Sequence, residues 1–154
     1  MEMAGEALVS QAALRKFREI VANQKGDVSV IDHPDEYPAP EFSRDISAQE
    51  SGFIHDIKAR TVGEQSLLLG AGRKSKEDEI DYTAGVVFAK RRGDFVHEGD
   101  LLAKLYSNSQ AKLEEVSREF PKVFTLGDEK PRRQPLIEKV FTKDGATTWK
   151  DYRG

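Results

Sequence analysis

Cysteine is absent from all 154 residues of the chain. Disulfide bonds, thiolate nucleophiles and cysteine-bound metals are therefore excluded from its chemistry. The sequence also has no run near the roughly 20 apolar residues that a membrane-spanning helix needs, so we expect no membrane partner. Its first residues carry Glu2 and Glu6, where an export signal needs a basic region before an apolar run. The lack of an export signal and of a membrane span favours a cytoplasmic location.

An excess of one charge is missing as well. The chain has 24 Lys and Arg against 27 Asp and Glu, a net charge of -3, and both signs are mixed along its length. No segment has the basic bias that attracts nucleic acid or an anionic membrane surface, so we expect no nucleic-acid partner. With 33% charged and 38% hydrophobic residues, the composition is typical of a folded, polar domain.

The first part of the chain predicts helices. A run of apolar residues at helical spacing indicates one amphipathic helix that ends near Gly26, which we expect in the left-handed cap position. The residues of its apolar face are Leu14, Phe17, Ile20 and Val21. Upstream, the apolar residues between Met3 and Val9 have little sequence of their own to pack against. Residues 1–31 therefore read as a helical segment that belongs to something larger.

Residues 32–41 contain three prolines and four acidic residues. Proline fixes its own backbone angle and pushes the preceding residue toward extended geometry, so this segment predicts a stiff linker between two parts of the chain.

Beyond the linker the pattern changes to short strands and turns. Residues 42–48 and 53–59 alternate as strands do, with Ser51-Gly52 as the turn between them. Thr61 and Glu64 fit a capping box at the start of a helix that Gly70 and Gly72 end.

Strands are expected over 85–90, 95–96 and 101–106, joined by turns at Gly93-Asp94 and Gly99-Asp100. Val96 and Leu101 are expected to fill the interior. A last helix is expected from Ser107, with Gln110 in the reciprocal capping position and Leu113, Val116 and Phe120 facing inward. The sequence thus predicts an α+β fold, with a β-rich domain over 42–122 and a tail over 123–154 that has one strand, 135–141.

Three stretches carry a resemblance to a known family. They are residues 13–20 with 24–27, the glycine-rich segment 68–81 (Leu-Leu-Gly-Ala-Gly-Arg-Lys-Ser-Lys-Glu-Asp-Glu-Ile-Asp), and 85–94 with 99–106. Together they resemble, in family order, the C-terminal part of the bacterial pyrimidine-nucleoside and thymidine phosphorylases. The resemblance implies that residues 1–31 are a helical remnant of the family's catalytic α/β domain. The tail after residue 121 matches less clearly.

The resemblance implies a fold and a reaction. The family is a group of pentosyltransferases in which a small helical domain and a large α/β domain enclose the active site and an α/β-hammerhead domain with a barrel-sandwich-like sheet follows. They cleave uridine or thymidine with phosphate into free base and (deoxy)ribose 1-phosphate. The family's phosphate loop, of the type Lys-His-Ser-Thr-Gly-Gly-Val-Gly-Asp-Lys, and its pyrimidine-binding arginine, serine and lysine are absent from this sequence. We therefore expect no catalytic, cofactor or metal residue here and no activity from the chain alone.

The glycine-rich segment supplies the candidate site. The resemblance implies that Gly70, Gly72, Arg73 and Asp81 lie in a loop that meets the catalytic domain. A phosphate loop is the alternative, but the Gly-Lys-Ser/Thr spacing it needs is missing. The close acidic and basic residues from Lys74 to Asp81 are typical of a solvated loop rather than a metal or acid–base site.

Two other functions stay open. The Gly-Asp turns are also seen in biotinyl and lipoyl carrier domains, but a carrier needs a lysine near position 109, where this chain has Ser109. A free-standing interaction module is the second alternative. The histidines, His33, His55 and His97, form no catalytic or metal-binding spacing. The implied partners are the N-terminal catalytic domains of the same enzyme, in a homodimeric parent whose substrates are phosphate and a pyrimidine nucleoside.

Overall fold

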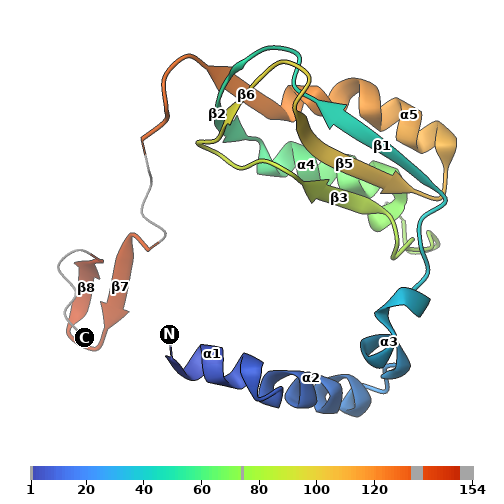
Figure 1. Cartoon of the computed structure of the whole chain (residues 1–154), viewed down its shortest axis with the longest axis vertical. Helices are drawn as coiled ribbons and strands as arrows, with labels where there is room; N and C mark the ends of the chain where they lie inside the picture. Colours follow the sequence, from blue (N-terminus) through green and yellow to red (C-terminus); the bar gives the residue numbers. More distant parts are fainter. Residues whose placement is uncertain (1, 74, 133–136, 150–154) are drawn as a thin grey trace. The chain divides into compact units, whose positions relative to one another are not determined.

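The computed structural model describes residues 2–73, 75–132 and 137–149. Helices and strands are mixed along the chain, which confirms the predicted α+β class (Figure 1). The chain divides into two compact units, Met1–Ala39 and Pro40–Gly154. The division falls inside the proline-rich segment that the sequence marks as a linker. No helix among the described residues is long and apolar enough to cross a bilayer.

The first unit consists of helical segments alone. They are α1 (Glu2–Val9), α2 (Ala12–Asn23), α3 (Ser29–Asp32) and the 3-10 turn η1 (Pro34–Glu36). An ion pair of 2.8 Å between Arg18 and Asp32 joins α2 to α3. None of the described residues in this unit is buried.

The end of α2 differs from the prediction. Lys25, with φ of 60°, takes the left-handed position that was expected of Gly26. The Gly26 amide donates to the carbonyl of Val21 at 2.9 Å, and the Lys25 amide donates to that of Ala22, which is the Schellman arrangement. A Cβ on Gly26 would lie 2.8 Å from Val21 Cγ1, so the glycine is needed for close approach rather than for a left-handed backbone.

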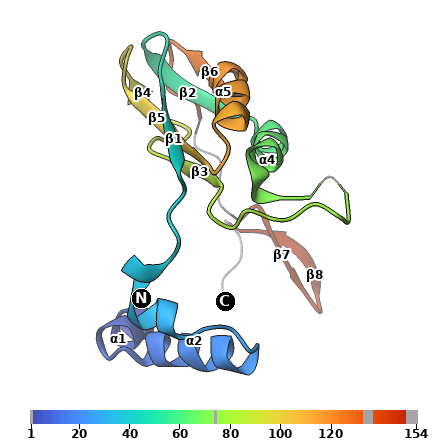
Figure 2. The ribbon, with the colours of Figure 1, turned by 90° about the vertical axis from the view of Figure 1, so that its right-hand side faces the viewer.

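The second unit contains two three-stranded antiparallel sheets and two longer helical segments (Figures 1 and 2). The first sheet has the order β1 (Phe42–Ser47), β5 (Leu101–Ser107), β3 (Gly85–Phe88). The second has the order β4 (Phe95–Val96), β2 (Gly52–Ile57), β6 (Phe124–Gly127). Helix α4 (Ala59–Ser66) continues into a π-helical turn, η2 (Leu67–Ala71), and α5 (Gln110–Glu119) continues into the 3-10 turn η3 (Phe120–Val123).

The strands β1 and β2 do not form the predicted hairpin, because each belongs to a different sheet. The chain crosses between the sheets after a register shift at Ile46/Ser47. There Ala48 exchanges backbone hydrogen bonds with the turn at Gly99-Asp100: its amide donates to the Asp100 carbonyl and its carbonyl accepts from the Gly99 amide. The predicted turn at Ser51-Gly52 is displaced: the bend lies at Gln49-Glu50, and Gly52 is already the first residue of β2. The hairpin pairing that the turn implied is overridden by contacts far along the chain.

The strand prediction for the C-terminal part was incomplete. β6 lies in the segment expected to be a tail, and it pairs with β2, so the sheet extends past residue 122. The predicted strand 135–141 is observed as β7 (Lys139–Thr142), paired with β8 (Gly145–Thr148), while positions 135 and 136 lie outside the described residues.

The hydrophobic core lies between the two sheets and α5. The three residues predicted to face inward from the last helix are all buried: Leu113, Val116 and Phe120. Val96 is buried as predicted, but Leu101 is exposed, and its neighbour Leu102 takes the interior position instead. The remaining core side chains come from β1, β2, β5, β6, η2, η3 and the segment after β1: Ile46, Ala48, Ile54, Leu69, Ala103, Leu105, Val123 and Phe124.

Both predicted helix starts are displaced. α4 begins at Ala59 and lacks a side-chain cap, so Thr61 and Glu64 lie inside the helix; the Glu64 carboxylate pairs with Arg60 instead. α5 begins at Gln110, and the capping hydroxyl belongs to Ser109, which accepts from the Lys112 amide. The hydroxyl of Ser107 instead donates to the Leu69 carbonyl at 2.7 Å and accepts from the Ser109 amide at 3.1 Å.

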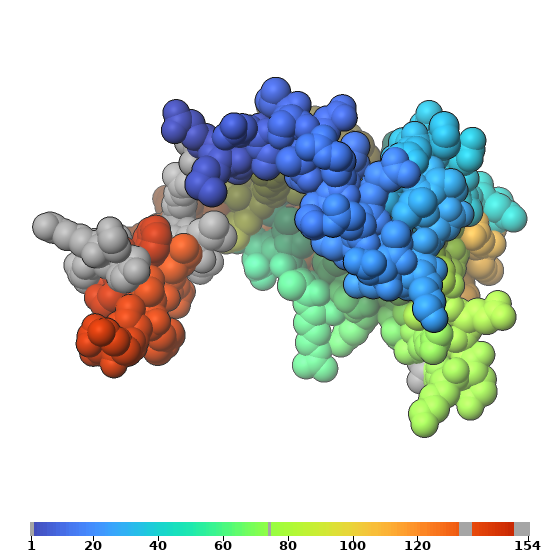
Figure 3. Space-filling view, turned by 90° about the horizontal axis from the view of Figure 1, so that it is seen from below, coloured from blue at the N-terminus to red at the C-terminus, as the bar shows by residue number. Residues whose placement is uncertain are grey.

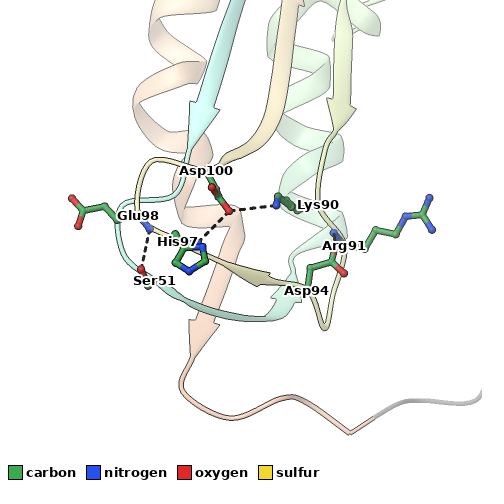
Figure 4. A network of polar contacts seen from close by, with 7 residues as sticks. All are labelled: Ser51, Lys90, Arg91, Asp94, His97, Glu98 and Asp100. Atoms are coloured by element: carbon green, nitrogen blue, oxygen red, sulfur yellow. Dashed lines mark hydrogen bonds and ion pairs between the residues drawn. The ribbon is translucent and has the colours of Figure 1, made fainter.

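The two Gly-Asp turns are confirmed and are built alike (Figure 4). Gly93 and Gly99 have φ of 93° and 88°, values that favour glycine. The aspartate after each glycine accepts from the amide three residues earlier: Asp94 from Arg91 at 2.7 Å and Asp100 from His97 at 3.2 Å. These turns set the positions of β4 and β5.

Candidate functional site

The glycine-rich loop begins where η2 ends and closes on itself at Asp81. The Asp81 amide donates to the Gly70 carbonyl at 2.9 Å, so the two ends of the loop are held together. The Ser107 hydroxyl holds the preceding carbonyl, that of Leu69, from β5. The base of the loop is therefore fixed to the core sheet.

Glycine is needed at positions 70 and 72 for two different structural reasons. Gly70 has φ of 116°, a conformation that side-chain-bearing residues rarely adopt, and this turns the chain out of the helix. Gly72 has an extended backbone, but a Cβ there would lie 2.8 Å from Leu67 Cδ1. Gly70 thus supplies the turn, and Gly72 lets the loop pass close to η2.

Asp81 is the polar centre of the loop base. Its Oδ1 accepts from the Thr83 amide at 3.0 Å, from the Thr83 hydroxyl at 2.7 Å and from Asn108 Nδ2 at 3.1 Å. Its Oδ2 accepts from the Asn108 amide at 3.2 Å. The carboxylate therefore joins the loop to the start of β3 and to the residue that precedes the cap of α5.

These contacts control the pKa of Asp81. Partial burial acts to raise the pKa of the carboxyl, but hydrogen bonds from Thr83, Asn108 and Ala84 together outweigh it and lower the pKa below its ordinary value. Asp81 is thus held as a charged acceptor, which suits a structural role and leaves no proton to transfer near neutral pH.

The tip of the loop projects from the second unit as the yellow-green segment in Figures 2 and 3. Arg73 is exposed, and within the described residues its side chain makes no hydrogen bond or ion pair. Lys76, Glu77 and Glu79 are exposed as well. Of the four candidates, the structure therefore brings Gly70 and Asp81 into contact, places Gly72 beside η2, and leaves Arg73 facing solvent.

Residues 70–73 and 75–81, the described part of the loop, show no phosphate-cradle geometry. Its glycines follow the C-terminal end of a helix, where the helix dipole is negative and disfavours an anion. A hollow of about 340 Å³ does lie beside the start of α5, lined by residues that include Ser109 and Lys112. The amides nearest its base are already satisfied, because Asn108 donates to Asp81 and Ser109 to the Ser107 hydroxyl. No group of three or more His, Asp or Glu side chains with metal-binding placement occurs in residues 2–73, 75–132 and 137–149.

The described histidines do not form a site together. His55 Nε2 lies 2.5 Å from the Glu129 carbonyl, and its ring fills the space over Gly127. His97 packs edge-on against Phe95, with ring centroids 5.2 Å apart. Where a carrier domain needs its lysine, this chain has Ser109, whose hydroxyl caps α5.

Sequence reasoning missed the partners of Asp81. The pattern Asp81-Tyr82-Thr83 carries a usable signal, because an aspartate often accepts from the amide two residues on. Asn108 carried no such signal, since it lies 27 residues away and reaches Asp81 only through the pairing of β3 with β5.

Comparisons with known proteins place this loop in context. Residues 53–127 match the family model described as the pyrimidine nucleoside phosphorylase C-terminal domain. The match begins in β2, ends at the last residue of β6 and includes the whole glycine-rich loop. The chain belongs to the pyrimidine-nucleoside phosphorylase family, in its C-terminal region.

Individual relatives agree with this assignment. The chain is similar to a pyrimidine-nucleoside phosphorylase of Staphylococcus aureus strain USA300, at 38% identity over 138 residues, which is 90% of this chain and 31% of the relative. A second relative, from strain MSSA476, is 39% identical over 123 residues, or 80% of this chain and 28% of the relative. The chain thus spans about a third of the length of the curated relatives that it matches.

Proposed function

We propose that the chain serves as the C-terminal accessory domain of a pyrimidine-nucleoside phosphorylase, a homodimeric cytoplasmic pentosyltransferase in pyrimidine nucleoside salvage. The reaction of that enzyme is the phosphorolysis of a pyrimidine nucleoside to free base and (deoxy)ribose 1-phosphate. The observation that carries the proposal is the family match over residues 53–127, which covers both sheets apart from β1 and the first residue of β2. In this role the second unit is the hammerhead domain that the resemblance implies.

The exposed apolar side chains of the first unit support the proposal that it contacts the remainder of the enzyme. The apolar face of α2 is open, with Leu14, Phe17 and Ile20 exposed by 46%, 53% and 47%. Met3, Leu8 and Val9 of α1 are exposed by 72% or more. An apolar surface of this kind on a polar chain marks a site of contact with another part of a protein. We propose that this surface packs on the catalytic α/β domain.

The glycine-rich loop is proposed as the second contact. Its base is fixed by Gly70 and Asp81, while its tip presents charged side chains to solvent, Arg73 among them. A loop with a rigid base and a polar tip loses little conformational entropy when it docks, which suits a surface that meets the catalytic domain repeatedly as the enzyme works.

The proposal is tested with a chimera. The chain replaces the matching C-terminal third of the Staphylococcus aureus relative, and phosphate-dependent release of uracil from uridine is measured. We expect release by the chimera and none by the relative's N-terminal two-thirds alone. If the chimera folds as a dimer and releases no base, the accessory role is wrong.

A loop variant in the same chimera tests the docking contact. Arg73→Ala is expected to lower kcat/KM roughly tenfold or more, as removal of a charged contact at an interface does, without changing the unfolding midpoint. Arg91→Ala is the matched control, because Arg91 is also an exposed arginine beside a glycine turn. Equal activities for the two variants would remove Arg73 from the docking surface.

A further inference from the structure

Asn108 contacts two segments that lie far apart in the sequence. Its Oδ1 accepts from the Glu41 amide at 2.7 Å, at the point where the linker enters β1. Its Nδ2 donates to Asp81 Oδ1 at 3.1 Å and to the Thr83 hydroxyl at 3.0 Å, at the base of the glycine-rich loop. We propose that Asn108 is a positioning residue that couples the linker end at Glu41 to the conformation of the Gly70–Asp81 loop.

The chemistry of the amide group supports a coupling rather than two separate contacts. The oxygen and the nitrogen of an asparagine side chain lie in one rigid plane, so a rotation that loses one partner moves the other atom as well. Only one of the two orientations of the Asn108 side-chain amide forms hydrogen bonds with both Glu41 and Asp81. Reversed, the amide would face its own N–H donors toward the Glu41 amide and its oxygen toward the Asp81 carboxylate.

The backbone of Asn108 strengthens the connection. Its amide donates to Asp81 Oδ2 at 3.2 Å, so both the main chain and the side chain hold the same carboxylate. The next residue, Ser109, caps α5, and its amide donates to the Ser107 hydroxyl, which in turn donates to the Leu69 carbonyl before Gly70. The backbone around Asn108 is therefore held by hydrogen bonds to the core sheet. Because it is held, we expect a movement of the chain at Glu41 to shift the Asn108 side chain and with it the loop base.

The consequence is reciprocal. A partner that orders the glycine-rich loop also fixes the chain at Glu41, and a partner that fixes the chain at Glu41 also orders the loop, by the same free energy. All of these contacts lie within the second unit, so the inference goes beyond the proposed function and can be tested on the chain alone.

The test changes one end and measures the other by NMR amide exchange in the whole chain. Asp81→Ala removes the acceptors of the loop base and touches no atom that bonds Glu41. We expect faster exchange at the Thr83 amide and a rise of roughly fivefold or more at the Glu41 amide. The reverse variant, Glu41→Pro, removes the N–H donor at the linker end, together with the glutamate side chain and the freedom of φ at this position. It is expected to speed exchange at Thr83.

The matched control is Asp94→Ala. Like Asp81, Asp94 accepts a backbone hydrogen bond within the second unit, from the Arg91 amide at 2.7 Å, but it belongs to the Gly93-Asp94 turn and not to the loop base. It is expected to speed exchange at Arg91 and leave Glu41 unchanged. Protection of the amide of Val116, whose side chain is buried in α5, reports that each variant is folded.

The exchange rates at Thr83 and Glu41 can each overturn the proposed coupling. Faster exchange at Thr83 with unchanged exchange at Glu41 in Asp81→Ala overturns the coupling, and so does unchanged exchange at both. If Asp81→Ala unfolds the unit, Glu41→Pro decides alone: Thr83 exchange must rise, and an unchanged rate overturns the proposal.

Discussion

The two units of this chain differ in how many side chains each of them buries. The second unit buries side chains from two sheets, α5, η2 and η3 in one core. The first unit is made of amphipathic helices whose apolar faces are open to solvent, and no described residue in it is buried. Short helices in water gain most of their stability from tertiary packing of the apolar face. The second unit therefore has a core of its own, whereas the described residues of the first unit bury no side chain, which supports our proposal that the first unit docks on a partner.

The largest expected effect comes from truncating one phenylalanine in each unit. Phe120 is fully buried, and Phe120→Ala is expected to lower the unfolding free energy by about 3–5 kcal/mol because it removes apolar burial and leaves a cavity. Phe17 is 53% exposed in α2, and Phe17→Ala is expected to change it by less than about 0.5 kcal/mol. Urea unfolding followed by circular dichroism measures both. Similar losses would mean that the first unit contributes to a shared core.

Glycine replacements give a smaller contrast. Gly70 has φ of 116°, so Gly70→Ala is expected to cost about 1–3 kcal/mol of backbone strain in the second unit. Gly5 lies inside α1, and a Cβ there would meet no other atom within 4 Å. Gly5→Ala is therefore expected to favour that helix by about 0.5–1 kcal/mol.

Helix content and the urea midpoint separate the two glycine effects. Gly70→Ala should lower the midpoint, while Gly5→Ala should raise the helical signal and leave the midpoint unchanged. A midpoint that falls in Gly5→Ala would contradict the picture of an open helix.

The smallest expected effect is a loss of stability at acidic pH. Asp100 has a pKa below its ordinary value of 3.8: the hydrogen bond from the His97 amide lowers it most, partial burial opposes this, and Lys90 lowers it further. A carboxyl whose pKa is lower in the folded state adds stability above the unfolded pKa, and that stability is lost as pH falls through the folded pKa. The second unit should therefore lose stability below pH 3.8, with Asp81 contributing in the same direction.

The check is the urea unfolding free energy measured at neutral pH and through the range below pH 3.8, in the wild type and in Asp100→Asn. The asparagine variant should lose less stability on acidification. Asp27 of the first unit also has a lowered pKa, through hydrogen bonds from the Ser29 side chain and backbone. Asp27→Asn is expected to leave the acid dependence of the midpoint unchanged, and a change would tie α3 to the core.

Local patterns predicted much of the second unit. The Gly-Asp turns were found because glycine at positive φ followed by an aspartate that accepts a backbone hydrogen bond is a short-range device. The inward face of α5 and of the start of η3 was found because Leu113, Val116 and Phe120 follow the helical period. In the candidate site, the helix stop at Gly70 was found from the glycine pattern, while the interdomain role of Gly70, Gly72, Arg73 and Asp81 stays a prediction.

The features that the sequence did not predict depend on long-range contacts. β6 was missed because Phe124 to Gly127 is a strand only through its pairing with β2. The turn at Ser51-Gly52 predicted a hairpin, but β1 pairs with β5 in one sheet and β2 pairs with β4 and β6 in the other. The contacts of Asn108 with Glu41 and Asp81 form because β5 pairs with β1 and β3, and no local sequence pattern predicts them.

The most direct test of the account is phosphate-dependent release of uracil and thymine from uridine and thymidine by the purified 154-residue chain. Because the family's phosphate loop and pyrimidine-binding residues are absent from this sequence, the expected result is no release above the blank. Release that requires phosphate and follows the protein through purification would contradict the account and would place a catalytic site within this chain.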